Sequence, residues 1–190
     1  MVRTFIVYVA DHPGVLNRVS SLFRRRGYNI ESLTVGHTDK PGVSRMTVVV
    51  AIDEVGAPLV MANLYKLAEV MRVDDITKVP AVHRELMIVK VASHPATESE
   101  VLRVLASGGA RVLETSNNSV VAEATGPEDE INRLIESLRP FEILELTRTG
   151  RVAMTSGHAP GLRAVAAAGE EQRGPFWNLT HSADLPRNCS

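Results

Sequence analysis

The sequence predicts an α+β fold made of two consecutive βαββαβ units followed by a C-terminal tail. Short apolar, β-branched runs alternate with segments of helical periodicity in the order of such a unit. The same order of elements then occurs a second time. The length of 190 residues accommodates two domains of roughly 75 residues and an extension.

The first unit begins with an apolar strand that leads directly into a turn. Residues 5–10 form the apolar run, and Asp11-His12-Pro13-Gly14 interrupts it. A helix is expected next, with Gly27 well placed to end it. The apolar residues that would share one face of this helix are Val15, Leu16, Val19, Leu22 and Phe23.

A hairpin, a second helix and a last strand complete the first unit. Residues 30–36 and 46–52 predict two strands joined by a turn-rich segment. Pro58 suits the first turn of a helix, and apolar residues follow at spacings of four, three and four (Val60, Leu64, Leu67 and Met71). Residues 70–79 supply the last strand. Such a unit forms a four-stranded antiparallel sheet with two helices on one face, which is the ferredoxin-like arrangement.

The second unit repeats this pattern. His12-Pro13 recurs as His94-Pro95, 82 positions later, and the same offset places Gly27 on Gly109. The elements expected with it are strands at 86–91, 111–115, 119–124 and 142–147 and helices at 98–106 and 127–138. The predicted organisation is therefore a domain at 1–79, a linker at 80–83, a domain at 84–154 and a flexible, glycine- and proline-rich tail at 155–190.

Composition favours a cytoplasmic protein without nucleic-acid or membrane partners. The net charge of -1 lacks the basic excess that neutralises a phosphate backbone, and no apolar stretch is long enough to cross a bilayer. The single cysteine, Cys189, allows no intrachain disulfide. Ferredoxin-like RNA-binding modules present aromatic residues to bases, but aromatics make up only 4% of this chain. The basic run Arg24-Arg25-Arg26 is explained most simply as a solvated last helical turn.

The sequence offers no catalytic cluster. Its six histidines are dispersed, and it contains no HExxH, CxxC or GxSxG motif and no phosphate-binding GxGxxG loop. We therefore expect no catalytic residue, no metal site and no cofactor in this chain. A small ferredoxin-fold enzyme remains as an alternative that turnover by the isolated chain would support.

One segment, Asp11 to Leu16, has the features of a ligand site. A glycine immediately before a helix lets a ligand approach the backbone, and the free N–H groups of the first helical turn can hold a carboxylate. An amino acid carries such a group. On spacing alone the commoner explanation is structural, with Asp11 as a cap and Gly14 as a turn residue.

Several segments resemble the small-subunit family of acetolactate synthase (acetohydroxyacid synthase). The N-terminal part, Asp11-x-Pro-Gly-Val-Leu-x-Arg-Val followed by Arg26-Gly-Tyr-Asn-Ile-Glu-Ser-Leu-Thr-Val and Ser44-Arg-Met-Thr, is similar to that family's amino-acid-sensing ACT domain. Residues 84–91 resemble the start of its C-terminal domain, and residues 149–154 resemble its end. The resemblance covers about residues 1–154.

The resemblance implies a non-catalytic regulatory subunit. It implies a partner, the catalytic large subunit, which this chain would activate and make sensitive to feedback inhibition by valine in branched-chain amino-acid biosynthesis. It also implies a homodimer through the ACT domains. Thiamine diphosphate, Mg and FAD would be held by the large subunit. The alternative is a free-standing ACT sensor that controls another enzyme or transcription.

The resemblance also implies the effector-binding residues. Effectors in this family bind between paired ACT domains, which points to Asp11, Gly14, Val15 and Leu16 of one chain and to Asn29 and Ile30 of the other. Many family members have asparagine at position 11, whereas an aspartate there could pair with the effector ammonium but would repel a nearby carboxylate. The second unit has Ala96 in place of Gly14 and Arg111 in place of Asn29, which suggests sensing by the first unit and assembly by the second.

Overall fold

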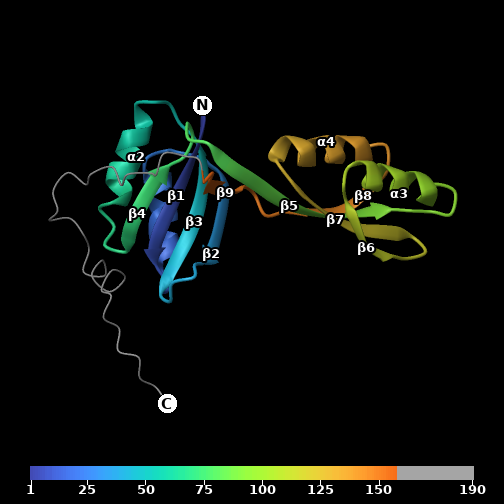
Figure 1. Ribbon diagram of the computed structural model, residues 1–190, viewed down its shortest axis with the longest axis horizontal. Helices are drawn as coiled ribbons and strands as arrows, with labels where there is room; N and C mark the ends of the chain where they lie inside the picture. Colours follow the sequence, from blue (N-terminus) through green and yellow to red (C-terminus); the bar gives the residue numbers. More distant parts are fainter. Residues whose placement is uncertain (158–190) are drawn as a thin grey trace, which may run out of the picture. The chain divides into compact units, whose positions relative to one another are not determined.

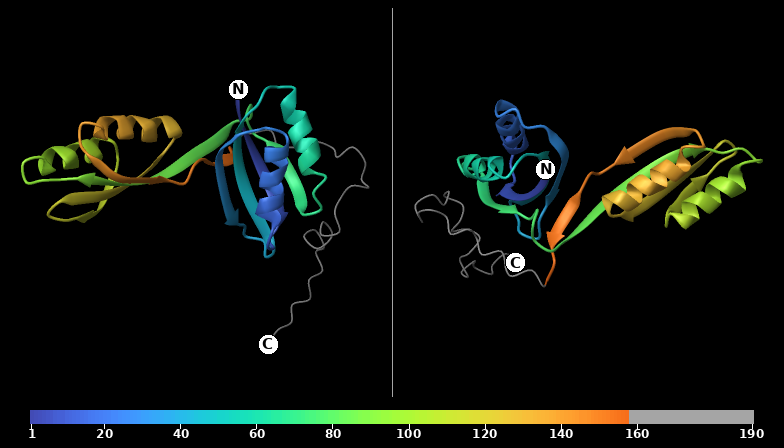
Figure 2. Two further views of the ribbon diagram at one scale, coloured as in Figure 1. Left: turned by 180° about the vertical axis from the view of Figure 1, so that it is seen from behind. Right: turned by 90° about the horizontal axis from the view of Figure 1, so that it is seen from above.

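The computed structural model describes residues 1–157, which form two compact units. Unit 1 comprises residues 1–80 and continues at residue 155, and unit 2 comprises residues 81–154. Each unit is an antiparallel sheet with two helices on one face, so the predicted α+β fold with two ferredoxin-like units is confirmed (Figures 1 and 2). The expected tail at 155–190 lies outside the described residues from position 158 onward.

Unit 1 follows the predicted order of elements. These are β1 (Val2–Ala10), α1 (Val15–Arg25), β2 (Ile30–His37), β3 (Val43–Ala51), α2 (Gly56–Leu64) and β4 (Val70–Asp75). The strands lie in the order β2-β3-β1-β4, so β1 is central and β2 is at an edge. The turn that follows β1 is therefore attached to the middle of the sheet.

The core of unit 1 forms where alternate β1 residues meet the apolar face of α1. Phe5, Val7 and Val9 point to the helices and are almost fully buried. Val15, Val19 and Phe23 pack against them from α1, as the helical spacing predicted. The prediction was wrong for Leu16, whose side chain is 44% exposed because it lies beside the buried stripe.

Two elements of unit 1 are shorter than predicted. Helix α2 ends at Leu64, so Leu67 lies in a turn and Met71 in β4. Strand β4 ends at Asp75 rather than at residue 79, because the Asp75 carboxylate accepts hydrogen bonds from the backbone and hydroxyl of Thr77 and bends the chain. Apolar spacing alone did not show either ending.

Unit 2 has the same arrangement with one additional strand. Its elements are β5 (Ala81–Ala92), α3 (Glu98–Ser107), β6 (Arg111–Thr115), β7 (Ser119–Gly126), α4 (Glu128–Leu138), β8 (Ile143–Arg148) and β9 (Val152–Thr155). The strand order is β6-β7-β5-β8, and β9 also pairs with β5. Strand β5 begins at Ala81, so residues 81–83 of the expected linker belong to a strand.

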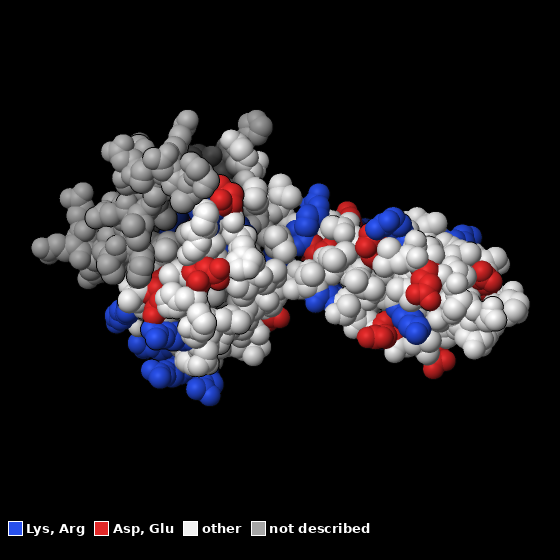
Figure 3. All heavy atoms as spheres, turned by 90° about the horizontal axis from the view of Figure 1, so that it is seen from below, with Lys and Arg blue, Asp and Glu red and all other residues white. Residues whose placement is uncertain are grey.

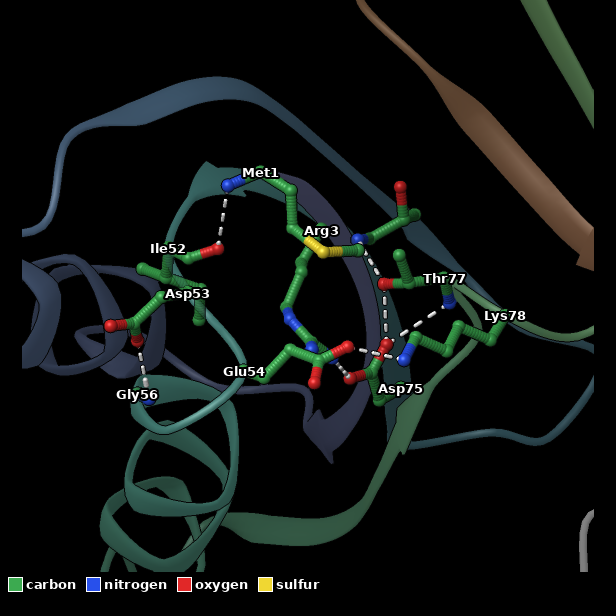
Figure 4. Close-up of polar contacts among 10 residues, drawn as sticks. Met1, Arg3, Ile52, Asp53, Glu54, Gly56, Asp75, Thr77 and Lys78 are labelled. Atoms are coloured by element: carbon green, nitrogen blue, oxygen red, sulfur yellow. Dashed lines mark hydrogen bonds and ion pairs between the residues drawn. The ribbon is translucent and has the colours of Figure 1, made fainter.

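A polar cluster fixes the N-terminal end of β1 in unit 1 (Figure 4). Arg3 donates from Nη1 to Asp75 Oδ2 at 2.6 Å, and its side chain is only 7% exposed. The Thr77 hydroxyl accepts the backbone N–H of Thr4 at 3.0 Å. Lys78 pairs with Glu54 nearby and lowers the pKa of that carboxyl through their hydrogen bond. This cluster holds the end of β4 against β1.

Two further structural findings concern residues 1–157. None of the helices in this range is long and apolar enough to span a membrane. No group of three or more His, Cys, Asp or Glu side chains in the same range is arranged to hold a metal ion.

Candidate functional site

The turn between β1 and α1 leaves the start of the helix open. Gly14 is the N-cap of α1 and has a φ of 91°, a left-handed conformation that glycine adopts without strain. No side chain caps the helix, and its first turn contains no acidic residue. Within the described chain, no group accepts a hydrogen bond of normal geometry from the backbone N–H groups of Val15, Leu16 and Asn17. The partial positive charge at a helix N-terminus therefore faces open space.

The surroundings of Gly14 leave room for a ligand. A Cβ built on Gly14 would meet no atom within 4 Å. Val15 is buried and anchors the helix in the core, whereas Leu16 is exposed beside the open amides. The turn thus combines N–H donors with an apolar side chain, which suits a small ligand that carries both a carboxylate and an aliphatic group.

Asp11 is engaged by the β2–β3 hairpin. Its Oδ1 accepts a hydrogen bond from Ser44 Oγ at 3.1 Å, and its Oδ2 lies 3.0 Å from His37 Nδ1. Its backbone N–H also donates to the carbonyl of Gly42 at 2.9 Å. The sequence analysis missed Ser44 and His37, which are 33 and 26 positions away from Asp11. Only the register of the hairpin, which pairs His37 with Ser44, could have identified them.

The second group of predicted site residues lies at the other end of β2. Asn29 is exposed just before β2, and Ile30 is half-buried at its first position. His37, which contacts Asp11, is the last residue of the same strand. Seven residue steps of roughly 3.3 Å separate the two ends by about 23 Å. A single chain therefore does not bring Asn29 together with Gly14.

The corresponding turn of unit 2 is closed and acidic. The carbonyl of His94 accepts the N–H groups of Thr97 and Glu98 at 2.8 and 2.9 Å. The first turn of α3 contains Glu98 and Glu100, which repel an anion. No glycine with positive φ precedes this helix. Unit 2 thus lacks the features that make the unit 1 turn a candidate carboxylate site.

Unit 2 has a surface recess of its own, with a volume of about 460 Å³. It is lined by His83, Pro127, Glu128, Asp129, Asn132 and Arg151. Arg151 pairs with Glu128 at 2.5 Å, and Asp129 pairs with Arg133 at 3.1 Å. Burial, with a smaller contribution from Arg151, lowers the pKa of His83. The charged side chains of the recess are paired within unit 2. On the face of unit 2 visible in Figure 3, positive and negative side chains are interspersed.

Comparisons with known proteins identify the same family along most of the chain. The family model described as an AHAS small subunit-like ACT domain matches residues 5–72, and the model for the small subunit of acetolactate synthase matches residues 84–157. The acetolactate synthase small subunit of Bacillus subtilis is 42% identical over 158 residues, which cover 83% of this chain and 92% of the relative. That of Mycobacterium leprae is 40% identical over 155 residues, which cover 82% and 92%.

A solved structure agrees with these sequence relatives. The acetolactate synthase small subunit from Thermotoga maritima matches with a TM-score of 0.78 and 31% identity. The match covers 82% of this chain and 98% of that chain. The similarity therefore extends over both units and is not confined to the segment from Asp11 to Leu16.

Proposed function

The chain belongs to the acetolactate synthase small-subunit family, and from this membership we propose that it activates the catalytic large subunit and confers feedback inhibition by valine. The pathway it controls would be branched-chain amino-acid biosynthesis, in the cytoplasm. The chain itself would be non-catalytic, and thiamine diphosphate, Mg and FAD would be bound by the large subunit. The single observation that carries the effector site is the open start of α1 at Gly14.

The open amides of α1 would bind the carboxylate of the effector. Helix N-termini are favourable places for anions, and the first turn of α1 has no acidic side chain that opposes one. The exposed Leu16 side chain would contact the isopropyl group of valine. Gly14 matters in two ways, because its conformation exposes the amides and its lack of a side chain leaves the approach clear.

A second copy of the chain would complete the site. Strand β2 is at the edge of its sheet, so two copies can pair their β2 strands in antiparallel fashion. A pairing centred on Leu33 would set Asn29 of one chain opposite His37 of the other. Asn29 and Ile30 would then lie near the partner's Gly14 turn, and the Asn29 side chain would engage the ammonium group of the effector.

Allosteric inhibition requires that valine bind one state of the complex more tightly than another. A coupling free energy of about 1–3 kcal/mol, typical of allosteric proteins, corresponds to roughly 5–150-fold in affinity. The two-chain site supports such coupling, because any change in how the two β2 strands meet would alter the effector contacts. Valine binding at the dimer interface would in this way change how the dimer acts on the catalytic subunit.

The experiment that tests this function measures acetolactate formation by the matching catalytic subunit, with and without this chain and with and without valine. We expect the chain to raise the rate and valine to lower it. Gly14→Asp should abolish inhibition, because it strains the left-handed turn and places in front of the open amides a carboxylate that repels that of valine. Ala96→Asp, at the corresponding exposed position of unit 2, is the matched control and should retain inhibition.

The outcomes separate the proposed function from its alternative. If the chain fails to activate a competent catalytic subunit yet binds an amino acid, the free-standing sensor becomes the better explanation. If Gly14→Asp retains normal inhibition, the effector site is elsewhere.

A further inference from the structure

We propose that Asp11 is a positioning residue that braces the effector turn and is not itself a ligand of the effector. In this role, its carboxylate holds the β1–α1 turn against the β2–β3 hairpin through Ser44 and His37. The inference rests on the proposed effector site at Gly14. It assigns Asp11, Ser44 and His37 one shared role, although the three residues are far apart in sequence.

Both oxygens of Asp11 are already occupied within one chain. Ser44 donates to Oδ1 at 3.1 Å, and His37 Nδ1 lies 3.0 Å from Oδ2. The Asp11 side chain is 39% exposed, so it is accessible to solvent but not free to turn toward a ligand without losing these contacts. Because each oxygen can accept a second hydrogen bond, an effector ammonium could approach this carboxylate only along the directions that Ser44 and His37 leave open.

The hairpin to which Asp11 is attached is itself well ordered by hydrogen bonds. The Thr38 hydroxyl donates to the Val43 carbonyl at 3.0 Å and accepts the N–H of Lys40 at 3.1 Å. The backbone N–H of Thr38 donates to the same Val43 carbonyl at 3.0 Å. The hairpin therefore offers a fixed support, and Asp11 connects the turn to it through side chain and backbone.

Unit 2 keeps the backbone part of this arrangement but has no counterpart of the side-chain brace. Ser93 corresponds to Asp11, and its N–H donates to Asn118 O at 2.9 Å, as the Asp11 N–H does to Gly42 O. The Ser93 side chain is buried and carries no carboxylate. The brace thus occurs only in the unit whose helix start is open, which links it to the site rather than to the fold.

The chemistry of asparagine separates a brace from a charged ligand. An asparagine at position 11 can accept the Ser44 hydrogen bond through Oδ1 and can donate to His37 Nδ1 through Nδ2. It therefore preserves both contacts while removing the charge. Alanine removes the contacts and the charge together. A brace tolerates asparagine, whereas a carboxylate that pairs with the effector ammonium does not.

The test is the dissociation constant for valine, measured by calorimetry on the full chain with its catalytic subunit. Taking about 1 kcal/mol per hydrogen bond, we expect Ser44→Ala to weaken binding roughly fivefold and Asp11→Ala by tenfold or more. Asp11→Asn should stay within about threefold of wild type. Ser119→Ala, which removes a hairpin hydroxyl contact in unit 2, is the matched control and should change nothing.

Each outcome decides between the two roles. Equal losses in Asp11→Asn and Asp11→Ala would overturn the brace and make Asp11 a charged ligand. Normal valine affinity in Ser44→Ala would also overturn the brace. Because this variant leaves the Asp11 carboxylate in place, it still tests the proposal if Asp11→Ala does not fold. A merely structural role would lower the melting temperature without a selective loss of valine affinity. Absence of amino-acid binding by the wild-type complex would overturn the proposed effector site together with the brace.

Discussion

Unit 1 has the buried Arg3 at the second position of β1, and unit 2 has the buried Glu85 at the corresponding position of β5. Arg3 pairs with Asp75 of β4, and Glu85 pairs with Arg148 of β8. Asp75 lies opposite Phe5 in the sheet just as Arg148 lies opposite Met87, so the two ion pairs occupy the same place in the fold. They differ in that the charges are exchanged.

The resemblance between the units extends to the neighbouring hydrogen bonds at this end of the sheet. In unit 1 the N–H of Thr4 donates to the Thr77 hydroxyl, and in unit 2 the N–H of Leu86 donates to the Thr149 hydroxyl. The opposite end has diverged, because the turn at Gly14 is open whereas the turn at Thr97 is closed. One end of each unit therefore holds the sheet in the same way, whereas the other end differs between the two units.

The largest expected effect comes from reversing one charge of a buried pair. Arg3→Glu would place a second carboxylate against Asp75 and should lower the stability of unit 1 by about 3–5 kcal/mol, the usual cost of breaking a buried pair. The double variant Arg3→Glu/Asp75→Arg copies the polarity of unit 2 and should recover at least half of this loss. Hydrogen exchange of β1 amides measures the local stability. A double variant as unstable as the single one would show that unit 1 does not accept an ion pair with the charge order of unit 2.

A smaller effect is expected where the helix ends of the two units differ. Gly108 corresponds to Arg26 by the repeat offset, but a Cβ at Gly108 would lie 2.5 Å from Leu134 Cδ1. Gly108→Ala should therefore cost unit 2 about 1–3 kcal/mol through overpacking against α4. Hydrogen exchange of α4 amides checks this. A stability loss below about 0.5 kcal/mol would mean that the Leu134 side chain moves aside and that α3 and α4 are less tightly packed than described.

The edge strands offer a third comparison, which concerns assembly. In the proposed pairing of two β2 strands about Leu33, Val35 lies opposite Glu31 of the second copy. Val35→Glu would place like charges opposite each other twice and should weaken the dimer by about 1–2 kcal/mol, roughly tenfold in its dissociation constant. Leu113→Glu, on the exposed edge strand β6 of unit 2, is the matched control. Sedimentation that shows equal effects of both variants would contradict a dimer built on β2.

The sequence predicted the fold well because local patterns determine it. The apolar runs and the spacing of Val15, Val19 and Phe23 placed the first strand and helix, and the repeat placed the second unit. The sequence could not show where β4 ends, because that depends on the side chain of Asp75 folding back onto Thr77. The extension of β5 to Ala81 was missed for a related reason, since its partner β9 lies some 70 positions later, beyond any local pattern.

The candidate site was predictable in part. The glycine before α1 was visible in the sequence, and its left-handed conformation follows the usual role of glycine at such a turn. The contacts of Asp11 with Ser44 and His37 were not visible, because they depend on the register of the β2–β3 hairpin, whose residues are distant from Asp11 in the sequence. Long-range polar contacts of this kind leave no periodic signal.

The smallest expected effect is a pH dependence that belongs to unit 2. His83 corresponds to Met1 of unit 1, whose side chain does not titrate. Burial lowers the pKa of His83 below the value of about 6.5 that it has in an unfolded chain. Between these two values the unfolded state binds more protons than the folded state, so stability must fall as the pH drops below about 6.5 and level off once folded His83 is also protonated.

The measurement is hydrogen exchange of β5 amides between about pH 7.5 and 5, corrected for the intrinsic exchange rate, in wild type and in His83→Asn. We expect the stability of His83→Asn to fall less than that of wild type as the pH drops from about 7.5 to 5. Arg151→Gln should reduce this fall in stability by a smaller amount, because the charge of Arg151 is the lesser of the two causes of the lowered His83 pKa. Identical pH profiles in wild type and His83→Asn would mean that His83 titrates alike in the folded and unfolded chain. The difference between the units at this position would then have no consequence for stability.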